Sequence, residues 1–272
     1  MIALRHTTVL RERSHTACAV AALGDRLLLA WAGTNGYLNT LSSRDGRRFG
    51  DKVTLPFRGW EKRSETRDRR APAVAGLGDD FHLAWTSDDK HPVHHVLGSP
   101  DIVDLGERTG HGPALAPWGD EIVLAWRGTD KHLNLIRGRG GGWAAPWRLT
   151  ETSRGAPALC VSDPELVLAW TGLDRRVHVL RHRDSGEHLR ARLDIESKEN
   201  PPAVCAWGDG LVVAWTARRG RITLVAVGPD GPGEPQPLDA ISYSAPALCT
   251  FGESLVVAWR NRLSRVCVGL AV

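Results

Sequence analysis

A motif that ends in Leu-Ala-Trp or Val-Ala-Trp recurs six times along the chain. Five copies place a proline 13 residues before the tryptophan, and Cys18 takes that place in the first copy. The tryptophan spacings are 54, 41, 44, 45 and 44 residues, and a period of roughly 40–50 residues is typical of propellers and other repeat arrays. The six tryptophans are Trp31, Trp85, Trp126, Trp170, Trp215 and Trp259.

Each repeat has the pattern of four short strands. The segment before the tryptophan, such as residues 166–170, is apolar at alternate positions on both faces, which fits a sheet packed between two others. A short apolar strand and a turn with glycine and an acidic residue precede it, and a third and a weaker fourth strand follow. The chain is therefore predicted to be all-β, a six-bladed β-propeller with four-stranded antiparallel blades.

The two ends of the chain support a closed ring. The last repeat stops after its third strand, and residues 2–10 form an unassigned strand-like segment. This N-terminal strand is predicted to close the last blade and to hide two sheet edges. We expect a single propeller domain, 1–272, with blades at about 11–57, 66–107, 109–150, 153–195, 198–239 and 242–272 plus 2–10.

Composition excludes several classes of protein. No apolar run approaches the roughly 20 residues of a membrane span, and the N-terminus lacks the pattern of a secretory signal. The net charge is +4, and the arginines are scattered rather than gathered in a stripe. Five cysteines, an odd number, do not indicate a disulfide framework. The sequence thus predicts a cytoplasmic monomer that binds neither nucleic acid nor membranes.

Several repeated residues are assigned to structure rather than to function. The tryptophans are expected to lie between blades as large apolar fillers. Small residues stand three positions after the proline and are expected to lie near the crowded axis; Cys160, Cys205 and Cys249 are among them. Four residues after the tryptophan stand Asn35, Asp89, Asp130 and Asp174, which favour a turn role over ligand contact. His94 and His95 face opposite ways in an alternating strand, so no metal site is predicted.

The loops that enter each first strand differ between copies. Three positions before the proline, or its equivalent, the copies read His15, Arg69, Gly110, Arg154, Glu199 and Tyr243. Variable polar residues on a repeating scaffold predict one asymmetric pocket over the channel mouth. In it Arg69 and Arg154 are candidates to clamp an anion, and Glu199, His15 and Tyr243 are candidate catalytic residues for acid–base chemistry.

Four further residues complete the predicted substrate-binding set. His111 and Asn200 follow directly after the variable position, and Asp68 precedes Arg69. Trp60 lies in an extra loop around residues 56–62, which is predicted to cover the ligand. The alternatives are solvated loop residues and a loop without function. Neither a cofactor nor a metal ion is expected.

The "APAL" and "LAW" motifs resemble the sialidase-like propeller repeats of actinobacterial proteins and, more loosely, propeller lectins. The segment 43–49, Ser-Arg-Asp-Gly-Arg-Arg-Phe, is similar to the Asp-box turn of sialidases, which is structural in that family. The resemblance implies an arginine cluster, a Tyr–Glu pair and an acid, and the positions that imitate this set are Arg69, Arg154, Tyr243, Glu199 and Asp68. The N-terminal Phe-Arg-Ile-Pro motif of sialidases is absent.

Three functions follow from this pattern. The first is an acid–base enzyme (a cyclase, lyase, isomerase or hydrolase) acting on a small metabolite of specialised metabolism, either anionic or neutral. The alternative is a non-catalytic, lectin-like propeller that binds carbohydrate, and a further one is a sialidase-like hydrolase or a protein-interaction platform. Equivalent polar sites that recur between blades distinguish a lectin from a single-pocket enzyme.

Overall fold

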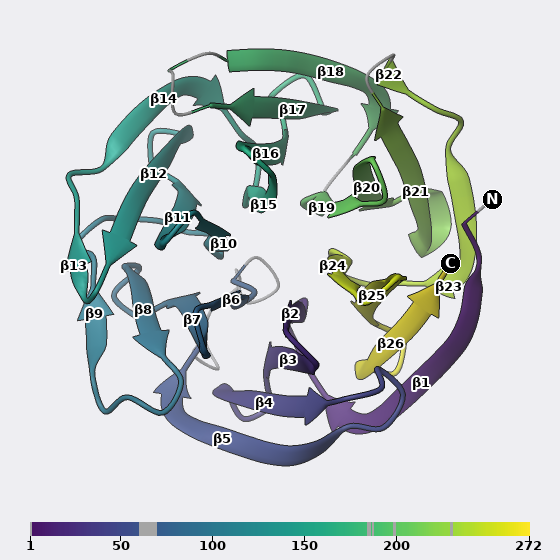
Figure 1. The fold of residues 1–272 in the computed structure, drawn as a ribbon, viewed down its shortest axis with the longest axis horizontal. Coiled ribbons are helices and arrows are strands. Elements are labelled where there is room, and N and C mark those ends of the chain that lie inside the picture. The colour runs from purple at the N-terminus through teal and green to yellow at the C-terminus, as the bar shows by residue number, and fades with distance from the viewer. Residues whose placement is uncertain (1, 60–69, 184–185, 187, 198–199, 229–230) are drawn as a thin grey trace.

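The strands form six antiparallel sheets in a ring around a central channel, as the computed structural model shows (Figure 1). It describes residues 2–59, 70–183, 186, 188–197, 200–228 and 231–272. The predicted six-bladed β-propeller is confirmed. In blades 1 to 5 the strands run from the channel outwards in chain order, so strands close in sequence pair with each other. No helix in these ranges is long and apolar enough to cross a membrane.

The strands are numbered along the chain. Blade 1 contains β2 (Ala19–Leu23), β3 (Arg26–Ala32), β4 (Tyr37–Ser43) and β5 (Gly50–Arg58). Blade 2 contains β6 (Ala73–Leu77), β7 (Asp80–Thr86), β8 (Pro92–Val96) and β9 (Ile102–Asp104). Blade 3 contains β10 (Ala114–Trp118), β11 (Glu121–Arg127), β12 (His132–Arg139), β13 (Gly142–Trp143) and β14 (Trp147–Thr152). Blade 4 contains β15 (Ala158–Ser162), β16 (Glu165–Thr171), β17 (Arg176–His182) and β18 (His188–Glu196). Blade 5 contains β19 (Ala203–Trp207), β20 (Gly210–Thr216), β21 (Arg221–Gly228), β22 (Gly231–Pro232) and β23 (Gln236–Ile241). Blade 6 contains β24 (Ala247–Phe251), β25 (Ser254–Arg260), β26 (Arg265–Ala271) and β1 (Leu4–Arg13).

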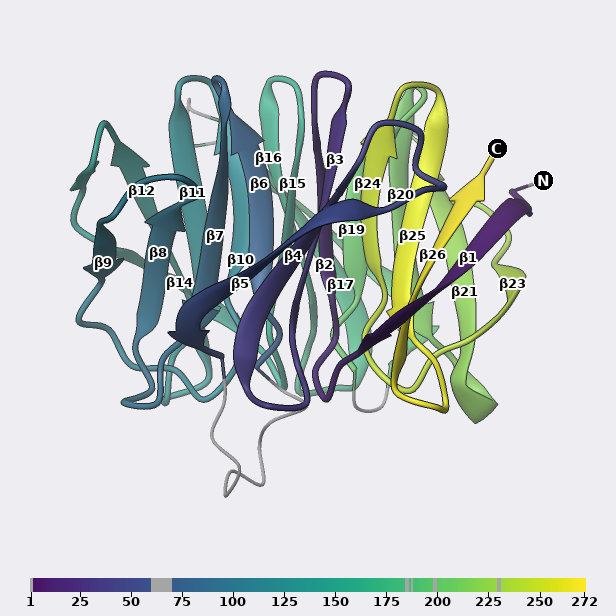
Figure 2. The same ribbon diagram turned by 90° about the horizontal axis from the view of Figure 1, so that it is seen from below.

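Two rims of the ring differ in their loops. At one, which we call the turn rim, tight turns join the first and second strands of each blade; these turns lie at the top of Figure 2. At the other, the entry rim, the chain enters each first strand and the second strand turns into the third. The predicted pocket residues that the structure describes belong to the entry rim: His15, His111, Arg154, Asn200 and Tyr243.

The sixth blade combines both ends of the chain. Strand β1 pairs antiparallel with β26, in a register that runs from Leu4 opposite Ala271 to Arg13 opposite Arg265. The two termini therefore lie side by side (Figure 1). The predicted closure by an N-terminal strand is confirmed, because β1 covers the open edge of β26.

The core lies between the blades. Six clusters of buried apolar side chains each join two neighbouring blades, and each repeat tryptophan belongs to one of them. All six tryptophan side chains are almost fully buried, with at most 5% of their surface exposed. Their predicted role as fillers between blades is confirmed.

The cysteines are free thiols in the apolar interior. Cys160, Cys205 and Cys249 stand on the innermost strands, which pack around the channel. Burial raises the pKa of the Cys205 thiol to about 12 and the pKa of Cys160 and Cys249 well above the usual value. These thiols stay protonated at neutral pH and act as small apolar fillers.

A buried hydroxyl ties each of four blades to the next. Ser14, Thr109, Ser153 and Ser242 are fully or almost fully buried, and each side-chain oxygen donates to a carbonyl at the end of the following blade's second strand. We call them the linker hydroxyls. Each stands four residues before the repeated proline or its Cys18 equivalent, a signal that the sequence reasoning missed.

Replacing one linker hydroxyl is expected to loosen one junction. In Ser153→Ala, the carbonyls of Gly155 and Thr171 lose their hydroxyl donor in a dry interior, so the free energy of unfolding is expected to fall by about 1–2 kcal/mol. Urea unfolding followed by tryptophan fluorescence measures the loss. Ser153→Thr is the matched control, because Thr109 makes the same contact elsewhere in the ring. Equal stability of wild type and Ser153→Ala would contradict the assignment.

Candidate functional site

The structure describes five of the predicted pocket residues. His15 and Asn200 are half-buried, His111 is buried, and Arg154 and Tyr243 are exposed in loops of the entry rim. Trp60, Asp68, Arg69 and Glu199 lie outside the described residues. The lining of the two cavities described below includes none of the five. Their convergence on a single pocket therefore stays a prediction.

The predicted covering loop begins later than expected. Residues 56–58 belong to β5, which continues to pair with β4 as far as Tyr37 opposite Arg58. Phe57 packs into the core, stacked on Trp85 at a ring-centroid distance of 5.1 Å. The part of the expected loop before Gly59 is thus strand, and its half-buried Phe57 side chain packs against the core shared with the next blade.

The two adjacent histidines of β8 point to opposite faces, as the alternation predicts. His94 contacts His82, with Nε2 and Nδ1 2.9 Å apart, whereas His95 packs against Phe57 of the preceding blade. Burial, with the nearby His82 and His95, lowers the pKa of His94 to about 4. No group of three His, Cys, Asp or Glu side chains in the described ranges is placed to hold a metal ion.

The turn role of the repeated Asn and Asp side chains is confirmed in three blades. The Oδ1 atoms of Asn35, Asp130 and Asp174 each accept the backbone N–H two residues further on, at 3.0–3.2 Å. The same turns, however, place a second polar side chain opposite the repeat tryptophan. These companions are Asn39, Asn134 and His178.

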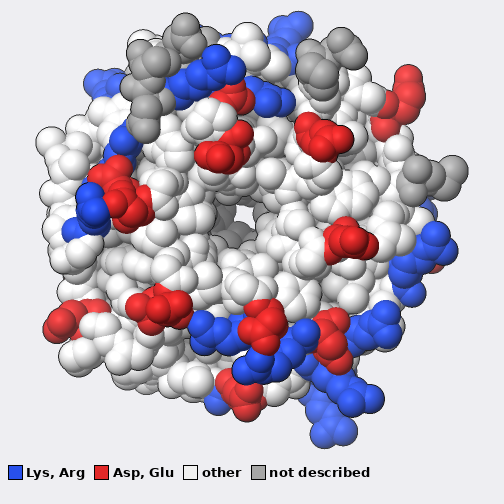
Figure 3. All heavy atoms as spheres, viewed as in Figure 1, with Lys and Arg blue, Asp and Glu red and all other residues white. Residues whose placement is uncertain are grey.

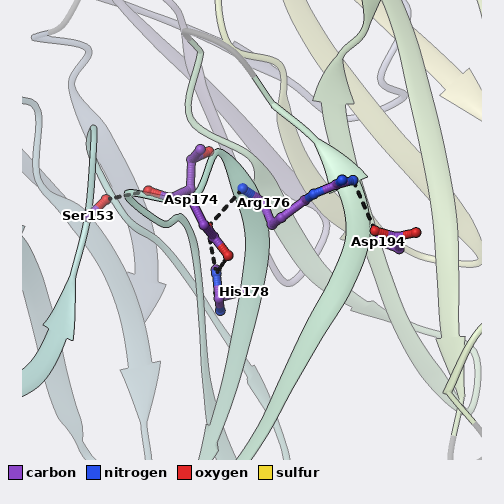
Figure 4. Close-up of polar contacts among 6 residues, drawn as sticks. Ser153, Asp174, Arg176, His178 and Asp194 are labelled. Atoms are coloured by element: carbon purple, nitrogen blue, oxygen red, sulfur yellow. Dashed lines mark hydrogen bonds and ion pairs between the residues drawn. The ribbon is translucent and has the colours of Figure 1, made fainter.

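In blade 4 this polar pair lines a cavity of about 350 Å³ against β14 of blade 3, which we call the blade 3–4 cavity. His178 stacks on Trp170 at 5.3 Å between ring centroids, and its Nε2 lies 3.0 Å from Asp174 Oδ1 (Figure 4). A Cβ atom at Gly172 would come within 2.6 Å of both polar atoms, so the turn needs glycine there.

Asp174 is held as a carboxylate. Burial alone raises the pKa of its side chain, but the hydrogen bonds from the Arg176 N–H and from His178 outweigh burial and lower it below the usual value. Arg176, whose backbone N–H binds Asp174, also forms an ion pair with Asp194 through its side chain, at 2.9 Å (Figure 4). The cavity therefore presents a fixed acceptor beside an aromatic stack.

A second ion pair joins the two blades across the cavity, from Glu151 on β14 to Arg190 on β18. The Glu151 side chain is only 5% exposed and pairs with Arg190, whose side chain is 60% exposed. Arg190 Nη2 also donates to Thr150 Oγ1 at 3.1 Å. The loop from blade 3 passes close by, since the Arg154 N–H donates to the carbonyl of Thr171, next to Gly172.

This arrangement offers donors and acceptors on two facing walls. Two carboxylates, a guanidinium, a hydroxyl and an imidazole surround a space whose volume fits a small ligand. Such a mixture suits a molecule with many hydroxyl groups, which donate and accept at once. Sequence reasoning singled out Asp174 only as a turn residue and missed Glu151, His178 and Arg190.

No family model matches the chain, and no curated protein matches it in sequence. Among solved structures, it superimposes on the fucose-specific lectin from Aleuria aurantia with a TM-score of 0.69 at 12% identity, over 96% of this chain and 92% of the lectin. SapL1 lectin in complex with α-methyl fucoside gives 0.69 at 14% identity, over 92% and 90%. BP39L lectin from Burkholderia pseudomallei gives 0.65 at 13%, over 92% and 80%. The chain shares the fold of these lectins.

The resemblance seen in the sequence is thus confirmed at its coarser level, a six-bladed propeller fold that propeller lectins share. No family model and no curated sequence supports the narrower sialidase-like repeat family. The box-like segment is a structural turn between β4 and β5. There Asp45 Oδ1 accepts the N–H groups of Arg47 and Arg48 at 2.8 and 2.7 Å.

Proposed function

We propose that the protein binds carbohydrate, and that the blade 3–4 cavity holds one sugar residue. The observation that carries this proposal is the pairing of polar walls around the Trp170–His178 stack. Carboxylates and a guanidinium form strong hydrogen bonds with hydroxyl groups, and they do so best where water is partly excluded. The lectin fold supports the same conclusion.

The repetition of the polar turn adds support. Blades 1 and 3 carry the same constellation as blade 4, a glycine followed by an Asx turn and a polar residue opposite the tryptophan. Recurrent sites favour carbohydrate binding over the acid–base enzyme that is the first expectation from sequence. The predicted loop residues His15, Arg154 and Tyr243 lie on the same rim and remain a proposal for additional contacts.

Binding is expected to depend on the charge of Asp174. A glycan array followed by calorimetry with methyl α-L-fucoside, the ligand type named for the similar lectins, identifies the sugar. Asp174→Asn is expected to weaken binding about tenfold, because it removes one charge-assisted hydrogen bond. The turn itself survives, since Asn35 makes it in blade 1.

The control variant lies on the other rim. Asp25→Asn, in an exposed turn of blade 1, is expected to leave the affinity unchanged. If no glycan binds, carbohydrate recognition is wrong. If a glycan binds equally well to wild type and to Asp174→Asn, the site lies elsewhere.

A further inference from the structure

A second cavity, of about 670 Å³, opens between blades 5 and 6 on the turn rim. We call it the blade 5–6 cavity. Its walls include the half-buried Trp207, Val212 and the exposed Ala226, and the turns that bound it carry Asp209 and Glu253. The Trp207 Nε1–H donates to the Glu253 carbonyl at 3.1 Å, which fixes the indole ring. The blade 5–6 cavity therefore lies on the rim opposite the proposed carbohydrate site, which belongs to the entry rim.

In blade 3 the equivalent place is filled. Trp118 corresponds to Trp207, and its Nε1–H likewise donates to the next blade's turn, at the Pro164 carbonyl (2.9 Å). Over the Trp118 ring lies the guanidinium of Arg137, 4.0 Å from the ring centroid. In the strand register, Arg137 pairs with Val123 as Ala226 pairs with Val212. Alanine therefore replaces the arginine and leaves the cavity.

A second replacement leaves negative charge unbalanced. Gly210 stands where blade 3 has Glu121, so the acid that loses its partner in blade 5 is the counterpart of Asp120. In blade 3, Arg139 forms an ion pair with Asp120 at 2.5 Å, and Arg137 pairs with Glu121. The counterpart of Arg139 in blade 5 is Gly228, and that of Asp120 is Asp209. Within the part of the chain that the structure describes, neither Asp209 nor Glu253 has an ion-pair partner. Acidic side chains ring this mouth of the channel, and most basic ones lie at the periphery (Figure 3).

We propose that the blade 5–6 cavity binds a guanidinium group carried on a short alkyl stem. The ligand takes the position of Arg137: its planar cation lies on Trp207, and its charge faces Asp209 and Glu253. A guanidinium suits this site better than an ammonium, because it is flat, weakly hydrated and stacks on aromatic rings. The cavity volume fits a free small molecule, and an arginine residue of a polypeptide is the other source of the same chemistry.

Calorimetry with butylguanidinium and butylammonium tests the proposal on the full chain. We expect butylguanidinium to bind one site at least tenfold more tightly than butylammonium. In Ala226→Arg, the new side chain covers Trp207 as Arg137 covers Trp118, so binding is expected to fall at least tenfold. Equal binding of the two cations, or unchanged binding by Ala226→Arg, would overturn the proposal.

Two further arms keep the outcome clear. Asp209→Asn with Glu253→Gln changes only exposed side chains and is expected to weaken butylguanidinium binding severalfold; no change would count against the charge pairing. A blocked peptide with one arginine among neutral residues tests the source. Binding of this peptide more tightly than butylguanidinium would overturn the free small molecule as ligand. Glycan binding is measured in parallel and is expected to stay the same in every variant.

Discussion

A chain that begins at Ser14, and so lacks β1, is expected not to form a stable propeller. Strand β1 supplies the outer edge of blade 6 over the register from Leu4 to Arg13, and Leu10 enters the core between blades 6 and 1. Each lost backbone hydrogen bond contributes about 1 kcal/mol, and an unpaired β26 presents an open edge. The sum is comparable with the whole stability of a typical domain, about 5–15 kcal/mol.

Thermal unfolding by circular dichroism, with size-exclusion chromatography, measures this effect. The matched control is a permuted chain in which residues 2–13 follow Val272 through a short Gly/Ser linker. Ala3 and Val272 exchange backbone hydrogen bonds, so such a linker spans the gap and the permuted chain is expected to be stable. A truncated chain that melts like the full one would show that closure by β1 is unimportant.

Acidification from pH 6.5 to pH 4 is expected to destabilise the protein by about 3 kcal/mol through His94. The side chain is 6% exposed and hydrogen-bonded to His82. The pKa of His94 falls from 6.5 in the unfolded chain to about 4 in the folded protein, and burial is the largest cause of this shift. Between pH 6.5 and pH 4, His94 is therefore protonated in the unfolded chain but stays neutral in the folded protein. The stability is fully present above pH 6.5 and is lost as the pH falls to 4.

The other blades provide the control for this experiment. The register places valine at the position of His82, and leucine or valine at the position of His94, in blades 3 to 6. His82→Val with His94→Leu is therefore expected to fold and to lose most of the pH dependence. Urea unfolding at pH 7, 5.5 and 4.5 compares the two proteins. The same slope in both would mean that other groups account for the acid sensitivity.

The repeat made the architecture predictable from sequence, because one burial pattern recurs and each tryptophan needs two blades to cover it. The site was harder to predict. Glu151 lies on an outer strand, where the copies share no motif, and it lines the same cavity as His178 only because two blades face each other. Ala226 can be recognised as the replacement of an arginine only when the strand register aligns it with Arg137. Sequence spacing alone gave neither alignment, since the loops differ in length.

The pairing of β1 with β26 also constrains the order of folding. Leu4 and Ala271 are register partners at opposite ends of the sequence. During synthesis on the ribosome, β1 has no partner until the last strand emerges, whereas every other described strand pairs with a close sequence neighbour. Contacts of such long sequence separation slow folding. We therefore expect ring closure to be the last step of folding, with β1 an unpaired strand until β26 is made.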